Sequence, residues 1–184
     1  SENAHKLLTT LSKSEFICLR VNTLKSKPRE VTRLLSDCGI ESTVSKTFSD
    51  CLYVSNKTNV SSLDAYIKGL FEIQDFGSQL ISKSLNPKPF SVVVDFCCGA
   101  GGKSLALSSI MKNTGLIYNI DVSPGRINKL KARARRAGAT NFYPLVVSSI
   151  GDEKIRSLFQ KASFVLADVP CTGSGTFGQY PHLK

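Results

Sequence analysis

The stretch "SVVVDFCCGAGGKSLALSSIM", residues 91–111, joins three kinds of local sequence that together decide the fold. Three valines lead into an aspartate, a loop with three glycines follows, and an apolar segment comes after the loop. A run of valines predicts a buried strand, and glycines let the backbone turn tightly and approach a ligand closely. A strand that passes through a glycine-rich loop into a helix is typical of nucleotide-binding α/β proteins. The stretch therefore predicts a nucleotide-like ligand at the loop.

The residues after this stretch repeat the alternation of strand and helix. Apolar runs predict strands at 91–97, 115–121, 142–147 and 164–170. Helices are expected at about 103–112, 124–137 and 152–160. The strand segments are almost continuously Val, Ile, Leu and Phe, which is typical of a parallel sheet buried on both faces. The pattern predicts an α/β fold, namely the first half of a Rossmann-like, doubly wound sheet.

The residues before this stretch follow a different order of elements. Strand patterns at 16–22, 41–46, 51–55 and 70–75 alternate with helical patterns at 27–39, 61–69 and 77–85. The order strand–helix–strand–strand–helix–strand predicts a small α+β domain of the ferredoxin-like or RNA-recognition type. The segment "NPKP" at 86–89 contains two prolines, which discourage a continuous helix. We therefore place a domain boundary there, with domains at 1–88 and 89–184.

Composition limits the class of protein and of partner. The 184 residues carry a net charge of +10, and the second domain holds 12 Lys/Arg against 5 Asp/Glu. This excess predicts a polyanionic partner, nucleic acid before membrane. No apolar stretch reaches the roughly 18 residues needed to cross a bilayer. The six cysteines show neither a disulfide framework nor metal-ligand spacing, so we expect a reducing, cytoplasmic location and no metal.

Three ligands compete for the glycine loop. A phosphate-binding P-loop requires a glycine where Cys97 stands, so this interpretation fails. A dinucleotide fingerprint requires a glycine where Ser104 stands, which weakens it. S-adenosylmethionine needs only close backbone approach, which Gly99 and Gly101 allow, together with an acid for the ribose, which Asp121 supplies at the end of the next strand. An NAD-dependent oxidoreductase would use an acid there too, so methyl transfer and hydride transfer both stay open at this point.

The segment "ADVPCTGSGT" at 167–176 favours methyl transfer. An acid followed by Pro–Cys at the carboxyl end of a parallel strand faces the crevice in which ligands bind. Hydride transfer needs no thiol there. Carbon 5 of cytosine becomes nucleophilic only after a thiolate adds to carbon 6, and a carboxyl group near ring nitrogen 3 matches the developing charge. Asp168 and Cys171 are the residue types that this chemistry requires.

The sequence resembles the RNA cytosine-5 methyltransferases of the Sun/nucleolar-protein type, which include bacterial small-subunit rRNA enzymes. Five segments carry the resemblance in the right order: 19–25, 69–80, 95–107, 121–127 and 168–176. It implies S-adenosylmethionine as cofactor and RNA as partner, rRNA before tRNA. It also implies a cofactor site made of Cys97, Cys98, Gly99, Ala100, Gly101, Gly102, Lys103, Asp121 and Asp168.

The resemblance also changes the role expected of Cys171. In this family the covalent nucleophile is usually a second cysteine in a Thr–Cys motif, and the Pro–Cys thiol helps to release the product. No cysteine follows Cys171 in this sequence, so we expect an incomplete fragment that lacks the nucleophile. A non-catalytic RNA-binding protein that retains the cofactor fold is the alternative. Two further departures are Ser149, where the family places an acid against the adenine, with Asp152 as a substitute, and Gly178–Gln179, where it places two arginines.

Several residues have both a functional and a structural interpretation. Arg20, Asn22 and Lys25 either contact RNA, which we favour, or are ordinary polar residues at the end of a strand. The basic face of the helix at 126–138 either meets RNA phosphates or is an ordinary solvated surface. Gln74 and Asp75 either face the cofactor crevice or cap a helix.

Overall fold

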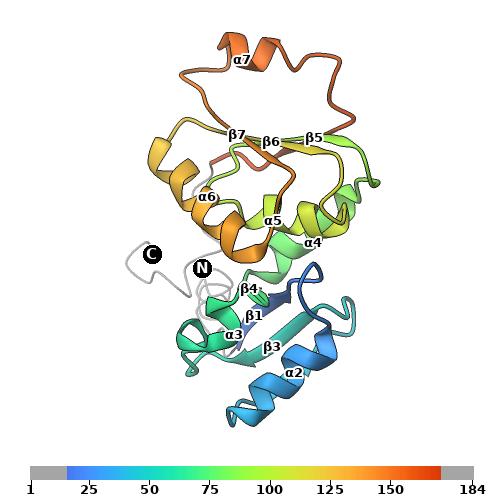
Figure 1. Cartoon of the computed structure of the whole chain (residues 1–184), viewed down its shortest axis with the longest axis vertical. Helices are drawn as coiled ribbons and strands as arrows, with labels where there is room; N and C mark the ends of the chain where they lie inside the picture. The colour runs from blue at the N-terminus through green and yellow to red at the C-terminus, as the bar shows by residue number, and fades with distance from the viewer. Residues whose placement is uncertain (1–15, 171–184) are drawn as a thin grey trace, which may run out of the picture.

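The computed structural model describes residues 16–170, which form two four-stranded sheets (Figure 1). Three helices, α4 (Phe76–Leu85), α5 (Gly102–Ile110) and α6 (Pro124–Ala137), lie between the sheets. The first sheet carries its other helices on its outer face, and only the short α7 (Glu153–Arg156) lies beyond the second sheet. Within the described residues, no helix is long and apolar enough to span a bilayer.

The first sheet has the order β2-β3-β1-β4 and is antiparallel throughout. Its strands are β1 (Phe16–Val21), β2 (Ser42–Val44), β3 (Cys51–Ser55) and β4 (Phe71–Ile73). The outer face is covered by α2 (Pro28–Asp37), η1 (Val60–Ser62) and α3 (Asp64–Ile67). Alternation along β1 sends Leu19 and Val21 into this core, while Arg20 points to the opposite face. The expected strand–helix–strand–strand–helix–strand order is confirmed, and the boundary at 88/89 stays a prediction.

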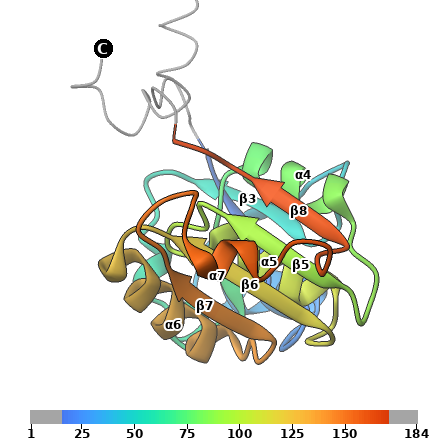
Figure 2. The ribbon, with the colours of Figure 1, turned by 90° about the horizontal axis from the view of Figure 1, so that it is seen from above.

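The second sheet has the order β7-β6-β5-β8 and is parallel throughout (Figure 2). Its strands are β5 (Val92–Phe96), β6 (Leu116–Asp121), β7 (Phe142–Val146) and β8 (Phe164–Ala167). The connections through α5 and α6 cover one face, and the connection through α7 crosses the other face to reach β8. The predicted Rossmann-like α/β fold is confirmed.

Two expected helices are shorter than their sequence patterns, because the segment 61–69 forms the 3₁₀ turn η1 and the four-residue α3. The segment 152–160 forms only four helical residues, Glu153–Arg156, followed by turns. Gln160 has a left-handed backbone with φ 65°, which a continuing helix does not allow. Ile155 and Leu158 still pack on the sheet against Val94 and Ile120. The apolar pattern at 152–160 therefore predicted which residues are buried but not the length of the helix.

Side chains predicted to contact RNA instead join the two sheets. Asn22 is 2% exposed, and its side-chain amide donates to the carbonyls of Gly69 (2.8 Å) and Ala137 (2.7 Å). The Lys25 ammonium donates to the carbonyls of Lys68 (3.0 Å) and Arg136 (2.6 Å), and Arg136 lies in the last turn of α6. Arg20, also 2% exposed, donates to the Gln74 side chain at 2.6 Å. The RNA prediction is therefore wrong for Arg20 and Asn22, because their buried polar groups bind protein groups inside the fold. Lys25 is exposed, so its predicted contact with RNA stays a prediction.

We predict that Gly69→Ala destabilises the chain much more than Gly39→Ala. Both glycines have a left-handed backbone, with φ +73° and +72°. A Cβ at Gly69 would lie 2.2 Å from the Arg136 carbonyl oxygen, whereas one at Gly39 would meet nothing within 4 Å. We expect about 1–2 kcal/mol for Gly39→Ala from backbone strain, and about 2 kcal/mol more for Gly69→Ala from overpacking. Urea unfolding of both variants measures the difference, and equal losses would contradict the close approach of the sheets at this point.

Candidate functional site

The site lies where the sheet order reverses. β5 is flanked by β6 on one side and β8 on the other, and the chain leaves β5 and β8 at the same sheet edge because all strands are parallel. In open α/β sheets, ligands bind in the crevice outside the carboxyl ends of the strands at such a point. The glycine loop follows β5, and Asp168 follows β8 directly. Chain topology thus brings the two predicted motifs together.

The loop after β5 has a backbone that most residues avoid. Cys97, Gly99 and Gly101 have left-handed φ values of 63°, 56° and 83°. Hydrogen bonds hold this shape: the Cys98 amide donates to the Ile120 carbonyl at 2.9 Å, and the Gly101 amide donates to the Cys98 carbonyl at 2.9 Å. Gly101 also caps α5, and a Cβ there would lie 2.9 Å from Leu130 Cγ. The loop therefore requires glycine at position 101.

Asp121 ends β6 and ties the loop to the neighbouring strand. Its side chain is almost fully buried, and its Oδ2 accepts a hydrogen bond from the Gly99 amide at 2.9 Å. Its Oδ1 accepts from the Ser123 amide at 2.8 Å, and an Arg126 guanidinium nitrogen lies 3.7 Å from Oδ2. The predicted ribose-binding acid therefore lies against the predicted loop, in the place that the motif requires.

Two hollows lie on either side of Cys97, which lines both. The hollow on the β6 side measures ≈ 160 Å³. Its lining is mainly apolar and consists of Phe96, Cys97, Ile120, Asp121, Val122, Arg126, Val147, Ser149, Ile150 and Pro170. Ser149 stands where an adenine-contacting acid was expected. Asp152 does not replace that acid, because its carboxylate caps α7 and accepts from the amides of Ser148 (3.0 Å) and Lys154 (3.0 Å).

The hollow on the β8 side measures ≈ 250 Å³ and is polar. It is lined by Ile73, Gln74, Asp75, Ser78, Asp95, Cys97, Cys98, Gly102, Lys103, Arg133 and Asp168. Lys103 and Asp168 form an ion pair across it, with 2.5 Å between Nζ and Oδ2. Gln74 and Asp75 follow β4, and Asp75 also caps α4 by accepting from the Ser78 amide at 3.2 Å. The capping role of Asp75 is thus confirmed, while its facing the cofactor stays a prediction.

Asp95 is a site residue that the sequence interpretation did not select. It lies in β5, is 1% exposed, and accepts a hydrogen bond from the Ser104 hydroxyl through Oδ2. Its Oδ1 has no hydrogen-bond partner among the described residues. Burial raises the pKa of Asp95 to about 6; Ser104 and Lys103 oppose the rise, while the charges of Asp168 and Asp121 add to it. An acid inside an otherwise apolar strand, just before the loop, was the available signal.

The loop cysteines are poor candidates for a nucleophile. Burial raises the pKa of both the Cys97 and the Cys98 thiols, and the nearby carboxylates of Asp95 and Asp121 raise it further. Both therefore stay protonated at neutral pH, whereas a nucleophilic cysteine needs a thiolate. Cys171, the predicted catalytic thiol, lies outside the described residues, and its predicted role stays a prediction.

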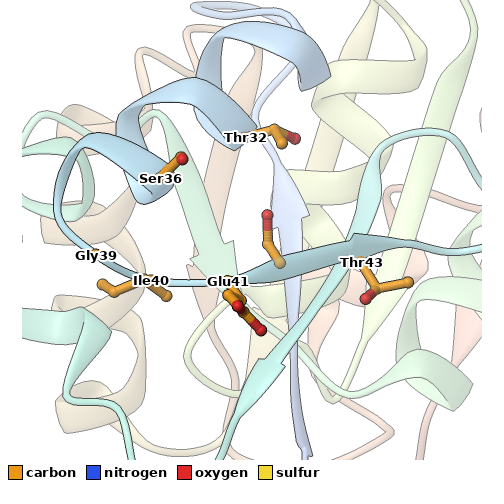
Figure 3. Close-up of a pocket in the computed structure, with 7 residues that line it drawn as sticks. Thr32, Ser36, Gly39, Ile40, Glu41 and Thr43 are labelled. Carbon is orange, nitrogen blue, oxygen red and sulfur yellow. The ribbon is translucent and has the colours of Figure 1, made fainter.

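The hollow drawn in Figure 3 is larger, at ≈ 520 Å³, but lies on the first sheet between α2 and β2. Its lining consists of Thr32, Ser36, Gly39, Ile40, Glu41, Ser42 and Thr43. Glu41 is its single ionisable side chain, so it offers hydroxyl groups but no acid–base pair. We therefore place the functional site at the strand ends.

We predict that Asp95 makes the free energy of unfolding fall between pH 4 and pH 7. Its pKa is about 6 in the folded chain and about 3.9 in an unfolded one, so the folded state binds the extra proton in this window. Stability is therefore fully present below pH 4 and is lost as pH rises through 6, by about 3 kcal/mol at roughly 1.4 kcal/mol for each pKa unit. Urea unfolding at several pH values measures the fall. The Asp95→Asn variant should lack this component, and identical pH profiles of the two chains would contradict the assignment.

Comparison with known proteins identifies the family. The model for the 16S rRNA methyltransferase RsmB/F family matches residues 82–184, which is more than half of the chain. A ferredoxin-like domain model of RsmF/B-like methyltransferases matches residues 1–61. The first model covers every strand of the second sheet, and the second model covers β1, β2 and β3 of the first sheet.

Individual relatives agree with the family models. The chain is 28% identical to a probable ribosomal RNA small subunit methyltransferase B from Synechocystis, over 90% of this chain and 37% of the relative. It is 29% identical to a mouse 28S rRNA (cytosine-C(5))-methyltransferase, over 91% of this chain and 21% of the relative. A methyltransferase homolog from Pyrococcus horikoshii of known crystal structure is 27% identical, with a TM-score of 0.83 over 95% of this chain and 57% of that one.

The chain thus spans 37% of one of these two curated relatives and 21% of the other. The family model covers the strand–loop–helix unit, Asp121 and the Asp168 segment together. This chain belongs to the RsmB/F family of rRNA methyltransferases.

Proposed function

We propose that this protein transfers the methyl group of S-adenosylmethionine to carbon 5 of a cytosine in RNA, with ribosomal RNA as substrate and the cytoplasm as location. The observation that carries the proposal is the glycine loop tied to Asp121, which opens on a hollow lined by carboxylates. Membership of the RsmB/F family supports it, and relatives named for rRNA cytosine-5 methylation support the choice of substrate.

The charges around the loop fit S-adenosylmethionine better than a dinucleotide. Asp95, Asp121 and Asp168 lie close enough for the charges of the other two to raise the pKa of Asp95. Three carboxylates favour a ligand with a sulfonium and an ammonium group, and they repel a pyrophosphate. The two cations that line the β8-side hollow are both ion-paired, Lys103 with Asp168 and Arg133 with Glu72. The hollow therefore disfavours an NAD-dependent oxidoreductase.

The buried polar atoms give the cofactor specific partners. Asp121 would hold the ribose hydroxyls, since its carboxylate is fixed by the Gly99 amide of the loop and by the Ser123 amide after β6. The unpartnered Oδ1 of Asp95 would accept from the ammonium group of the amino-acid end. The unpartnered side-chain nitrogen of Gln74 would donate to the carboxylate of that end. When bound, the cofactor supplies an electrophilic methyl group at its sulfonium.

The reaction needs an activated cytosine ring, and the chain supplies part of the machinery. Asp168 leaves β8 at the hollow, where its carboxyl group would stabilise the charge that develops on ring nitrogen 3. Lys103 holds that carboxyl group in place. The role of Cys171 in product release rests on the family resemblance, since this residue lies outside the described ones.

Positive charge outside the hollow would attract the RNA. On α6, Lys129, Lys131 and Arg135 are exposed, while Arg133 and Arg136 are paired with a buried acid. Only part of the basic face predicted from sequence is therefore available for phosphates. The remaining exposed cations still raise association with a polyanion, and this contribution weakens as salt concentration rises.

We predict that Asp121→Asn weakens binding of S-adenosylhomocysteine by about 10- to 100-fold, the loss expected when a charged hydrogen-bond acceptor is removed. Asp152→Asn is the matched control, because it makes the same carboxylate-to-amide change at a helix cap outside both hollows. Its affinity should stay within about twofold. Isothermal titration calorimetry with the three chains measures both affinities.

The reaction itself is tested with labelled S-adenosylmethionine and ribosomal RNA, followed by identification of the labelled nucleoside. Because no cysteine follows Cys171 in these 184 residues, we expect little turnover, with the transferred label confined to 5-methylcytidine. Label in any other nucleoside, or an increase of NADH fluorescence on mixing with the chain, would contradict the proposal.

A further inference from the structure

Two arginines of α6 bind the same buried carboxylate of the first sheet. Glu72, in β4, is 1% exposed. Its Oε2 lies 2.8 Å from Arg133 Nη2, and its Oε1 lies 2.5 Å from Arg136 Nη2. Arg133 and Arg136 are three residues apart, so they extend from the same face of the helix. A single acid of the first sheet thus holds two cations of α6 in place.

The two arginines differ in their other contact. Arg133 donates through Nη1 to the carbonyl of Ala100, inside the glycine loop, at 3.0 Å. Its guanidinium also lies against Gly102, where an added Cβ would be 3.9 Å from both terminal nitrogens. Arg136 turns back to the first sheet, with its guanidinium carbon 4.0 Å from the centre of the Tyr66 ring. Arg133 therefore connects the first sheet to the loop, and Arg136 does not.

The loop needs such a support because its backbone is strained. Cys97 has a left-handed backbone without being glycine, and such residues persist where their surroundings fix them. Asp121 holds the loop from β6 and Leu130 packs on it from α6. Ala100 is the loop residue whose carbonyl is bound by a charged side chain anchored in the other sheet.

We propose that Arg133 is a positioning residue for the cofactor site and that Glu72 holds it in place, so that the first sheet sets the affinity of the glycine loop for its ligand. The ligand's identity rests on the proposed function above. The first domain then contributes to cofactor binding through a defined chain of contacts, Glu72 to Arg133 to the Ala100 carbonyl.

The test compares Arg133→Met with Arg136→Met in the 184-residue chain. Each variant removes one ion pair with Glu72, so both should lower the urea midpoint to a similar extent. Only Arg133→Met removes the bond to the loop. It should weaken binding of S-adenosylhomocysteine by about tenfold, because a part-buried charged hydrogen bond to the loop is lost, whereas Arg136→Met should stay within about twofold. Arg133→Lys and Arg136→Lys repeat the comparison in chains that keep both charges, in case a methionine variant does not fold.

Amide hydrogen exchange gives a readout that needs no ligand. The three loop amides that can be followed are all hydrogen-bonded: Cys98 donates to the Ile120 carbonyl, Gly99 to the Asp121 carboxylate and Gly101 to the Cys98 carbonyl. In the ligand-free chain, their exchange should accelerate at least tenfold in Arg133→Met and stay near wild type in Arg136→Met. If wild-type chain fails to bind S-adenosylhomocysteine, the proposed function fails while the exchange result still decides this inference. If Arg133→Met and Arg136→Met change exchange and affinity equally, both arginines only stabilise the fold, and the proposal that Arg133 positions the loop is overturned.

Discussion

The glycine loop after β5 depends on a backbone conformation that it cannot hold by itself. Three of its residues are left-handed, and the structure fixes them from outside through the Asp121 carboxylate, the Leu130 side chain and the hydrogen bonds to β6. Each support comes from β6 or α6, which follow the loop in sequence. The parallel order β6-β5-β8 is therefore what brings the acid, the loop and Asp168 to one edge. The geometry of the site is a consequence of sheet topology.

Features set by neighbouring residues could be predicted from the sequence. The valine run of β5 and the ends of α6, capped by Ser123 and by left-handed Gly138, follow from local patterns, and the expected range 124–137 matches the helix. The length of a strand depends on its neighbours in the sheet and was predicted less well. The expected strand at 41–46 forms only Ser42–Val44, because β2 lies at the sheet edge and pairs on one side with β3 alone.

The direction in which charged side chains point could not be predicted, because it depends on residues distant in sequence. Glu72 lies more than 60 positions before its arginine partners, and Asn22 binds the carbonyl of Ala137. From sequence alone, a basic residue on an amphipathic helix looks the same whether it faces solvent or a buried carboxylate. Asp95 could not be selected from the sequence because its raised pKa follows from burial, which the sequence does not show. An acid within an apolar strand is equally compatible with a structural role. The glycine and Pro–Cys motifs were recognisable because their residues are adjacent in sequence.

The distribution of charge indicates two different binding surfaces, one for a polyanion and one for a cationic ligand, which the net charge alone does not distinguish. The net charge of +10 suggests a uniformly basic protein, yet the two cations that line the β8-side hollow are held in ion pairs, Lys103 with Asp168 and Arg133 with Glu72. That hollow is lined by three carboxylates against these two cations, while the outer surface of α6 stays basic. A polyanion drawn to that surface gains nothing by entering the hollow, since the carboxylates there repel its phosphates. A cationic methyl donor experiences the reverse preference. Internal ion pairing thus keeps the two ligands of the proposed reaction apart until a neutral base is presented at the hollow.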